Sequence, residues 1–242
     1  MTAATHSPRR ATDYRDLLLA GRWFRSVPAP FQEALLEMSH LRRVAAHELV
    51  VPRVSSSPSP PGCDLFAVVE GQVRVSRAAG DGTEVVLTIL EPPGWAGEPA
   101  LFDGACRTYD LTAETDAAIV EVPTARLHAF LDREPQHWRD LGRLMASKLR
   151  LAFLGMDEGG RASVRQRVAH RLLMAADGYG EWTDRVYPLV RVRQETMALM
   201  VGSSRQSVNL ALRALEGEGL VKLGYGGVEV LDRERLRDAA RL

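Results

Sequence analysis

The sequence predicts an α+β protein with three parts: an N-terminal antiparallel β-roll, a long helix, and a compact C-terminal module of helices and a hairpin. Short alternating apolar segments between turn residues run from about 41 to 122, which is typical of an antiparallel barrel or sandwich. An apolar stripe with helical spacing covers 135–156, and a helix–turn–helix pattern followed by a hairpin ends the chain. We expect four segments: a flexible leader at 1–20, the roll at 21–133, the long helix and hinge at 134–158, and the C-terminal module at 159–242.

Composition restricts the class of protein. The 242 residues are 45% hydrophobic and 26% charged, which suits a folded protein rather than a disordered one. Two cysteines, Cys63 and Cys106, exclude a disulfide framework and a four-thiolate metal or iron–sulfur site. No apolar run approaches the ~20 residues of a membrane span, and the run at 17–21 is too short for a signal-peptide core. We therefore expect a soluble, cytoplasmic protein with no membrane partner.

The zero net charge hides an asymmetry along the chain. Lys and Arg together number 31, as do Asp and Glu. Residues 161–242 hold 14 basic and 10 acidic side chains, which leaves 17 basic and 21 acidic ones for residues 1–160. A basic C-terminal third on an acidic body indicates a local anion-binding role for the smaller part.

The roll follows a short amphipathic helix, predicted at 31–38. Apolar residues in alternation or in short runs predict strands at 65–69, 72–77, 84–90, 109–113 and 117–122. Gly80-Asp81-Gly82 predicts a hairpin turn between the second and third of these strands, because glycine tolerates the positive φ that such turns need. The Ser- and Pro-rich segment 55–62 is expected to be a loop of the sheet.

The long helix predicted at 135–156 carries apolar residues three or four places apart, which leaves two interpretations open. The stripe packs against the chain's own roll, or it pairs with the same stripe of a second copy, which the length of the helix favours. The residues expected at such a homodimer interface are Leu141, Met145, Leu149, Ala152 and Met156. Gly155, Gly159 and Gly160 then form a hinge.

The last third of the chain predicts a winged helix-turn-helix. A helix is expected at 164–176, a short helix at 195–201, a turn at Gly202-Ser203 and a second helix at 204–216. A hairpin with a glycine-rich tip follows at 220–231. Ser203 and Gln206 fit a capping box, which would set the start of the second helix.

The second helix has two faces of different chemistry. The face expected to be buried consists of Val208, Ala211, Leu212 and Leu215. Gln206, Leu210 and Arg213 lie roughly opposite, with Asn209 on the flank and Arg205 at the first turn. In a recognition helix such residues meet base edges in the major groove, where Arg pairs with guanine, Gln with adenine and an apolar side chain with the thymine methyl. The alternative is a surface helix with no special role.

A second candidate site lies in the roll at 97–108, a segment that we call the cassette. Gly97 lets the backbone approach a ligand closely, Arg107 is a bidentate phosphate donor, and Thr108 adds a hydroxyl. The carboxylate of Glu98 can accept a hydrogen bond from a sugar hydroxyl. These residue types favour a sugar phosphate, whereas an internal Glu98–Arg107 salt bridge is the structural alternative.

With these motifs in this order, the chain resembles the bacterial Crp/Fnr regulators, the family of the cyclic-AMP receptor protein and the fumarate–nitrate reduction regulator, over roughly 22–232. Gly97-Glu98-x-x-Leu101-Phe102 followed by Arg107-Thr108 resembles the family's phosphate-binding cassette, and 194–208 resembles its DNA-reading motif. The resemblance implies a jelly roll of the cyclic-nucleotide-binding type, a dimerisation helix and a DNA-binding winged helix-turn-helix.

The resemblance also assigns roles to residues. Gly97 and Glu98 would hold the ribose of a cyclic nucleotide, cAMP or cGMP, and Arg107 with Thr108 its cyclic phosphate. The residues expected to contact DNA are Gln194, Ser204, Arg205, Gln206, Ser207, Asn209 and Leu210, of which Arg205 and Gln206 would read bases, and Gln194, Ser204 and Ser207 would position phosphates. A homodimer would bind a near-palindromic double-stranded site, with RNA polymerase as a further partner and without a metal.

Three departures from the family pattern restrict what carries over. Ala152 and Phe153 stand near the places where the cyclic-AMP receptor protein offers a Thr-Ser pair to adenine, and neither side chain can hydrogen-bond a base edge. Leu210 replaces a base-reading arginine, so a different DNA half-site is expected. The cassette is also about one residue shorter between Phe102 and Arg107. Phosphate and ribose recognition is supported by these residues, and adenine selection is not.

Three other functions compete with this interpretation. The first is the same DNA-binding regulator without a nucleotide, which is constitutive or answers another signal, such as oxidation of Cys106. The second is a cupin-like enzyme, but the six histidines form no H-x-H or H-x-x-x-H pair that would suit its metal. The third is a protein–protein adaptor whose winged helix binds no DNA. We expect a regulator and not an enzyme.

Overall fold

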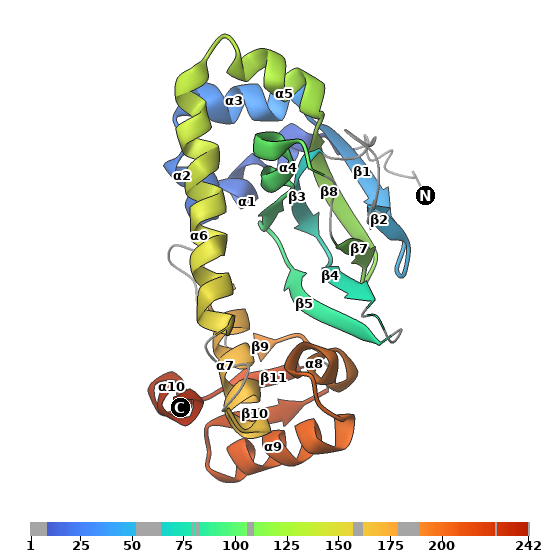
Figure 1. The fold of residues 1–242 in the computed structure, drawn as a ribbon, viewed down its shortest axis with the longest axis vertical. Coiled ribbons are helices and arrows are strands. Elements are labelled where there is room, and N and C mark those ends of the chain that lie inside the picture. Colours follow the sequence, from blue (N-terminus) through green and yellow to red (C-terminus); the bar gives the residue numbers. More distant parts are fainter. Residues whose placement is uncertain are drawn as a thin grey trace, which may run out of the picture. The chain divides into compact units, whose positions relative to one another are not determined.

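The computed structural model describes residues 9–51, 64–78, 80, 83–105, 109–156, 162–178, 189–225 and 227–241 (Figure 1). Its strands form three sheets, with the orders β1-β8-β3-β6, β2-β7-β4-β5 and β10-β11-β9. Contacts group residues 1–73 with 90–142 in a first compact unit, and residues 74–89 with 143–242 in a second. The predicted α+β class is confirmed: an N-terminal domain of antiparallel sheets with helices, and a C-terminal helix-turn-helix domain.

The first unit contains strands and helices at the predicted places and several that the sequence did not predict. Its helices are η1 (Ala11–Tyr14), α1 (Arg15–Leu19), α2 (Arg22–Ser26), α3 (Ala29–Met38), α4 (Glu98–Asp103), α5 (Thr124–Leu131) and η2 (Pro135–His137). Its strands are β1 (His40–Val44), β2 (Leu49–Val51), β3 (Leu65–Glu70), β6 (Trp95–Ala96), β7 (Asp110–Ala113) and β8 (Ala117–Val122). The strands β1, β2 and β6 had no clear sequence pattern because they are short or mixed in polarity.

Strand β8 lies between β1 and β3 and pairs antiparallel with both. Val44 lies opposite Ala117 in one ladder, and Leu65 opposite Val122 in the other. Side chains on both faces of β3 and β8 are buried, which explains why their sequences are nearly unbroken apolar runs rather than alternating ones.

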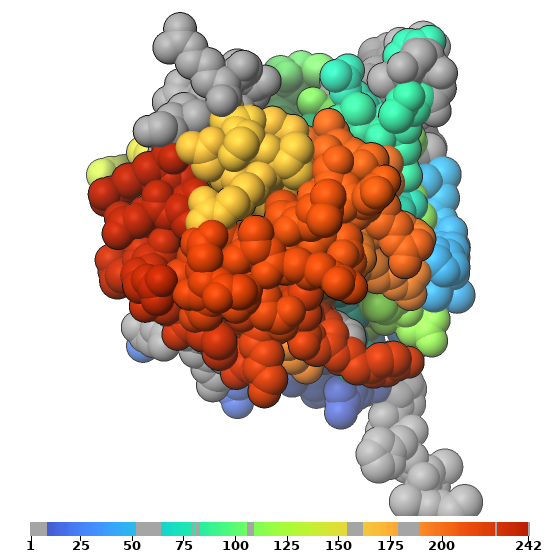
Figure 2. All heavy atoms as spheres, turned by 90° about the horizontal axis from the view of Figure 1, so that it is seen from below, coloured from blue at the N-terminus to red at the C-terminus, as the bar shows by residue number. Residues whose placement is uncertain are grey.

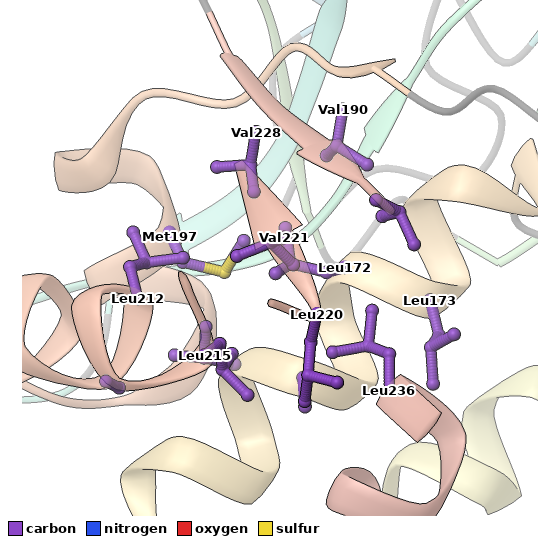
Figure 3. Close-up of a cluster of buried hydrophobic side chains, with 14 of the residues drawn as sticks. Leu172, Leu173, Val190, Met197, Leu212, Leu215, Leu220, Val221, Val228 and Leu236 are labelled. Atoms are coloured by element: carbon purple, nitrogen blue, oxygen red, sulfur yellow. The ribbon is translucent and has the colours of Figure 1, made fainter. Parts of the chain in front are cut away.

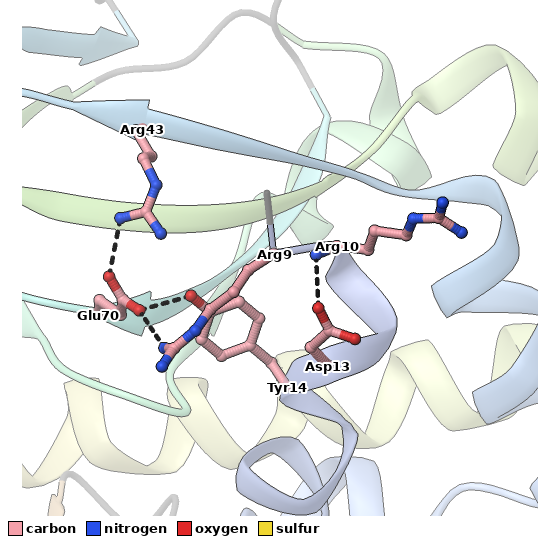
Figure 4. Close-up of polar contacts among 6 residues, drawn as sticks. All are labelled: Arg9, Arg10, Asp13, Tyr14, Arg43 and Glu70. Atoms are coloured by element: carbon pink, nitrogen blue, oxygen red, sulfur yellow. Dashed lines mark hydrogen bonds and ion pairs between the residues drawn. The ribbon is translucent and has the colours of Figure 1, made fainter. Parts of the chain in front are cut away.

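Residues 11–19 are helical, which differs from the flexible leader expected at 1–20. Tyr14 and Leu18 of this segment are buried. The hydroxyl of Tyr14 donates a hydrogen bond to Glu70 Oε1 at 2.5 Å, and Arg9 and Arg43 donate to the same carboxylate at 2.8 and 3.0 Å (Figure 4). The polar composition of the segment concealed two apolar side chains at helical spacing, which is enough to bury one face. Residues 1–8 lie outside the described part of the chain.

The second unit holds the end of the chain. Its elements are β4 (Val73–Ala78), β5 (Glu84–Leu90), α7 (Val164–Ala176), β9 (Leu189–Val190), α8 (Gln194–Val201), α9 (Arg205–Gly217), β10 (Val221–Gly224), β11 (Gly227–Val230) and α10 (Arg233–Ala240). The helices predicted at 164–176, 195–201 and 204–216 are confirmed within one or two residues. The sequence did not predict β9, which pairs with β11, or α10.

One hydrophobic core unites α7, α8, α9, the β10–β11 hairpin and α10 (Figure 3). Its largest members are Leu172, Leu173, Met197, Leu212, Leu215, Leu220 and Leu236. Helix α7 begins with a capping box, in which Ser163 Oγ accepts from the backbone N of Gln166 at 3.2 Å. The four buried residues predicted for the second helix are confirmed, because Val208, Ala211, Leu212 and Leu215 all belong to this core.

The long helix α6 (Trp138–Met156) extends from the first unit into the second. Its predicted stripe does not have one uniform environment: Leu141 is fully buried in its own chain, whereas Leu149 is 52% exposed. Neighbouring Leu144 is also fully buried, and Phe153 is 57% exposed. The stripe therefore packs against its own chain at Leu141, while pairing with a second copy stays a prediction for the exposed end.

Several predicted features lie outside the described residues. They are the loop at 55–62, residues 81 and 82 of the predicted turn, Gly159 and Gly160 of the hinge, and both cysteines.

Candidate functional site

The turn between α8 and α9 positions the predicted recognition helix. Gly202 ends α8 in the left-handed region, with φ 59°, and the backbone N of Ser203 donates to the carbonyl of Ala198 at 3.0 Å. Ser204 is the N-cap of α9, and its hydroxyl accepts from the backbone N of Ser207 at 3.1 Å. The predicted capping box of Ser203 and Gln206 is therefore wrong by one residue, because Ser203 closes the preceding helix.

The outward face of α9 is polar at both ends, with an exposed leucine between them. Arg205, Gln206 and Arg213 are exposed, and Leu210 is 64% exposed although apolar. This face lies opposite the buried residues of α9, as the sequence predicts. The α9 segment, orange in Figure 2, lies on the front of the view from below. Most of the Leu210 side chain is accessible to a binding partner.

Two contacts connect residues of α9 that are expected to bind DNA with helix α8. Arg205 Nη1 donates to Glu195 Oε1 at 3.0 Å, and both side chains are mainly exposed. Asn209 Nδ2 donates to Gln194 Oε1 at 3.1 Å. The hydroxyls of Ser204 and Ser207 lie 2.9 Å apart. All seven predicted DNA-binding residues thus lie on α8, on α9 or in the turn, on one continuous stretch of the second unit.

The hairpin beside α9 presents an aromatic residue that the sequence analysis did not single out. Tyr225, at the tip between β10 and β11, is fully exposed. The backbone N of Leu223 in β10 donates to Glu216 Oε1 of α9 at 2.8 Å, which ties the hairpin to the predicted recognition helix. The signal that could have identified Tyr225 is a lone aromatic residue within a run of glycines.

The described part of the cassette has a backbone geometry that requires glycine. Gly97 has φ 106° and precedes α4, whose first residue, Glu98, is only 2% exposed. Burial of an acidic side chain needs partners, so Glu98 belongs to a built polar environment rather than to a solvated loop. Arg107 and Thr108 lie outside the described residues, and the choice between a ligand pocket and a Glu98–Arg107 salt bridge stays open.

The predicted dimer-interface residues divide between the core and the surface. Leu141 is buried in its own chain, Met145 is half-buried, and Leu149 and Ala152 are exposed. The side chain of Met156 lies outside the described part of the structure. The exposed end of α6 is thus the part that a second copy could contact.

Two structural features bear on the predicted absence of a metal and of a membrane partner. Among the described residues, no three His, Cys, Asp or Glu side chains gather closely enough to hold a metal ion. Within the same part of the chain, no helix combines the length and the apolar character needed to cross a bilayer.

Comparison with protein families matches both halves of the chain. The cyclic nucleotide-binding domain matches residues 59–134, and the Crp-like helix-turn-helix domain matches residues 166–239. The CRP-like cAMP-activated global transcriptional regulator of Mycobacterium tuberculosis is 32% identical over 182 residues, which cover 75% of this chain and 81% of that protein. The cyclic AMP receptor protein of Thermus thermophilus is 33% identical over 180 residues, 74% of this chain and 80% of that one.

Solved structures show the same fold. A CRP-family transcriptional regulator from Thermus thermophilus superposes with a TM-score of 0.61 at 26% identity and covers 82% of this chain and 96% of its own. FixK2 from Bradyrhizobium japonicum has a TM-score of 0.71 at 21% identity, with 84% of this chain and 98% of that one covered. At such identity the second similarity supports the architecture alone.

Proposed function

Because the chain belongs to the Crp/Fnr family of transcription regulators, we propose that it binds a near-palindromic DNA site as a homodimer under the control of a cyclic nucleotide. Its relatives are transcriptional regulators rather than enzymes. The observation that carries the proposal is the outward face of α9, which displays Arg205, Gln206 and Leu210 opposite a fully packed face.

Each residue of the helix-turn-helix has a proposed task at DNA. Arg205 and Gln206 read base edges in the major groove, and Leu210 contacts a thymine methyl. The uncharged donors Gln194, Ser204 and Ser207 bind phosphates, which fixes the register of the helix on the duplex. Asn209, hydrogen-bonded to Gln194, orients that side chain or contacts DNA itself.

The proposed dimer interface is the exposed end of α6. Leu149, Ala152 and Phe153 place an apolar patch in solvent, which a second copy would cover. A two-fold interface presents two identical recognition helices, and this symmetry explains why a near-palindromic site is expected. Leu141 is left out of this interface, since its own chain already buries it. RNA polymerase as a further partner stays a prediction.

The proposed ligand site is the cassette. The left-handed Gly97 and the buried Glu98 support it, together with the match to the cyclic nucleotide-binding domain and the cAMP-activated relatives. Glu98 accepts a ribose hydroxyl, and Arg107 with Thr108 binds the cyclic phosphate. A nucleotide that prefers the DNA-competent dimer would increase its population.

Calorimetric titration with cAMP, cGMP and a cyclic dinucleotide tests the ligand. We expect saturable heat with one of them, lost in Arg107→Ala and retained in the control Arg133→Ala, an exposed residue after α5. The responding nucleotide identifies the base. If none of the three gives heat, nucleotide control is wrong, and the chain is a nucleotide-independent regulator.

Selection of a duplex from a random pool, followed by affinity measurements, tests DNA recognition. Arg205→Ala should lose ~1–3 kcal/mol of specific binding. Arg237→Ala on α10 is the control that removes the same charge elsewhere. Unchanged binding by Arg205→Ala would favour the adaptor interpretation.

Sedimentation equilibrium tests the dimer: Leu149→Glu should give monomers, and Leu49→Glu, at an exposed leucine of β2, should not.

A further inference from the structure

We propose that four rings, Trp23, Trp95, Phe102 and Trp138, transmit nucleotide binding in the cassette to the first turn of α6. We call these residues the aromatic bridge. They are positioning residues, because they act through the cassette and the helix rather than on the ligand or on DNA. The proposal rests on the proposed function, since it requires a ligand in the cassette.

The first connection between the cassette and α6 starts at Phe102, which follows Glu98 in the chain. Phe102, in the last turn of α4, lies with its ring centroid 5.1 Å from that of Trp138, at an interplanar angle of 58°. Trp138 is the first residue of α6. Phe102 remains 41% exposed, so its ring is not simply part of the core, and it contacts α6 through the ring of Trp138. A shift of α4 therefore acts directly on the start of the long helix.

The second connection to α6 starts at Trp95, which precedes Gly97 in the chain. Trp95, in β6, is buried and contacts the ring of Trp23 edge to face, at a centroid distance of 5.0 Å and an angle of 68°. Trp23 Nε1 donates a buried hydrogen bond to the carbonyl oxygen of Asp140, in the first turn of α6, at 2.7 Å. Because this hydrogen bond is directional, a shift of the Trp23 indole moves the first turn of α6 with it.

A third contact supports the same turn. His128 Nε2, on α5, lies 3.3 Å from the carbonyl oxygen of Leu101 in the cassette, and its ring lies 5.8 Å from that of Trp138. The cassette is thus connected to residues 138–140 from both sides of Gly97 and Glu98. All of these contacts lie within the first compact unit.

The arrangement gives a ligand a way to act at a distance. A nucleotide at Gly97 and Glu98 contacts the backbone between Trp95 and Phe102, and both rings meet the same helical turn. Close-packed interiors have discrete arrangements rather than continuous ones, so a ligand that prefers one arrangement of the cassette selects one position of α6. Helix α6 carries the exposed apolar patch, and the DNA-binding elements follow it in the chain.

The test measures how strongly nucleotide and DNA binding are coupled, as the ratio of DNA affinities with and without the nucleotide that gives heat. In Phe102→Ala and in Trp23→Phe, which keeps a ring but loses the donor to Asp140, we expect this ratio to fall by at least about fivefold. Saturable nucleotide heat should be retained in Trp23→Phe, which lies outside the cassette, and its thermal midpoint should fall by only a few degrees, as expected for the loss of about one buried hydrogen bond. Trp138→Phe, which keeps an aromatic contact, should restore most of the coupling relative to Trp138→Ala. Leu49→Ala is the control, with an exposed leucine of the same unit.

The outcomes separate this inference from the proposed function. A general loss of stability would weaken DNA binding with and without nucleotide alike and would leave the ratio unchanged. Wild-type coupling in both Phe102→Ala and Trp23→Phe overturns the aromatic bridge while the proposed function stands. A wild-type protein that binds no nucleotide, or that binds it without any change in DNA affinity, overturns both. Trp23→Phe, the smaller change, decides the matter if Phe102→Ala does not fold.

Discussion

Arg205 Nη1 lies 3.0 Å from Glu195 Oε1, so the residue expected to read guanine is paired with a carboxylate of the preceding helix. Both side chains are mainly exposed, at 67% and 69%. A pair so exposed adds little to stability, and the Glu195 carboxylate competes with DNA for the Nη1 donor of Arg205.

Replacing Glu195 should therefore strengthen DNA binding. Glu195→Gln removes the competing acceptor, and we expect DNA affinity to rise by about two- to fivefold, the equivalent of ~0.5–1 kcal/mol. The free energy of unfolding should change by less than ~1 kcal/mol. Glu234→Gln, which breaks the Arg237 pair on α10 with the same change of charge, is the control. Equal gains in both variants would show an effect of net charge rather than of the Arg205 pair.

The N-cap of α9 predicts that Ser→Ala changes at two adjacent serines affect stability differently. Ser204→Ala removes the hydroxyl that accepts from the backbone N of Ser207 and should destabilise the protein by ~0.5–2 kcal/mol. Ser203→Ala keeps that cap, and we expect a change within ~0.5 kcal/mol. Urea unfolding without DNA measures both. A larger loss of stability in Ser203→Ala than in Ser204→Ala would support the capping box of Ser203 and Gln206 that the sequence suggested.

Glu70 makes the N-terminal helices sensitive to acid. The Tyr14 hydroxyl, and then Arg43, hold the pKa of Glu70 below its ordinary value, against the effect of burial. A carboxyl with a lowered pKa in the folded state stabilises it above the unfolded pKa, and this contribution is lost as the pH falls through the folded pKa. Glu70→Gln should thus be less stable than wild type at pH 7, and the difference should shrink toward pH 3.

Denaturant unfolding over that pH range measures the difference. Tyr14→Phe should show the same trend, because it removes the largest cause of the lowered pKa. Glu33→Gln, at an exposed residue of α3, is the control. A difference between Glu70→Gln and wild type that is independent of pH would contradict the prediction.

Gly227 permits a close approach of strands β9 and β11. A Cβ at this position would lie 2.6 Å from the carbonyl oxygen of Val190 in β9. Since backbone must move to relieve this contact, Gly227→Ala should cost ~1–3 kcal/mol in unfolding free energy. Gly217→Ala, at the end of α9 where a Cβ meets open space, should be neutral or stabilise by up to ~1 kcal/mol. Similar values for the two variants would exclude the close approach as the cause.

Local patterns in the sequence determined the type of most elements and the orientation of α9. Apolar residues at period two or in short runs predicted β3, β7 and β8, and the spacing of Val208, Ala211, Leu212 and Leu215 predicted which face of α9 is buried. These inferences hold because hydrophobic burial follows the periodicity of the backbone, which a single sequence displays. The motifs at 97–108 and 194–208 carried the family resemblance for the same local reason.

Contacts between distant residues were decided by the tertiary structure alone. Leu141 and Leu149 occupy equivalent places in one stripe, yet the chain buries Leu141 fully and leaves Leu149 52% exposed. Trp23 bonds to Asp140, 117 positions away, and Tyr14 bonds to Glu70, 56 positions away. A periodic pattern states that a face will be buried but not against what, since that depends on how the elements pack after they form.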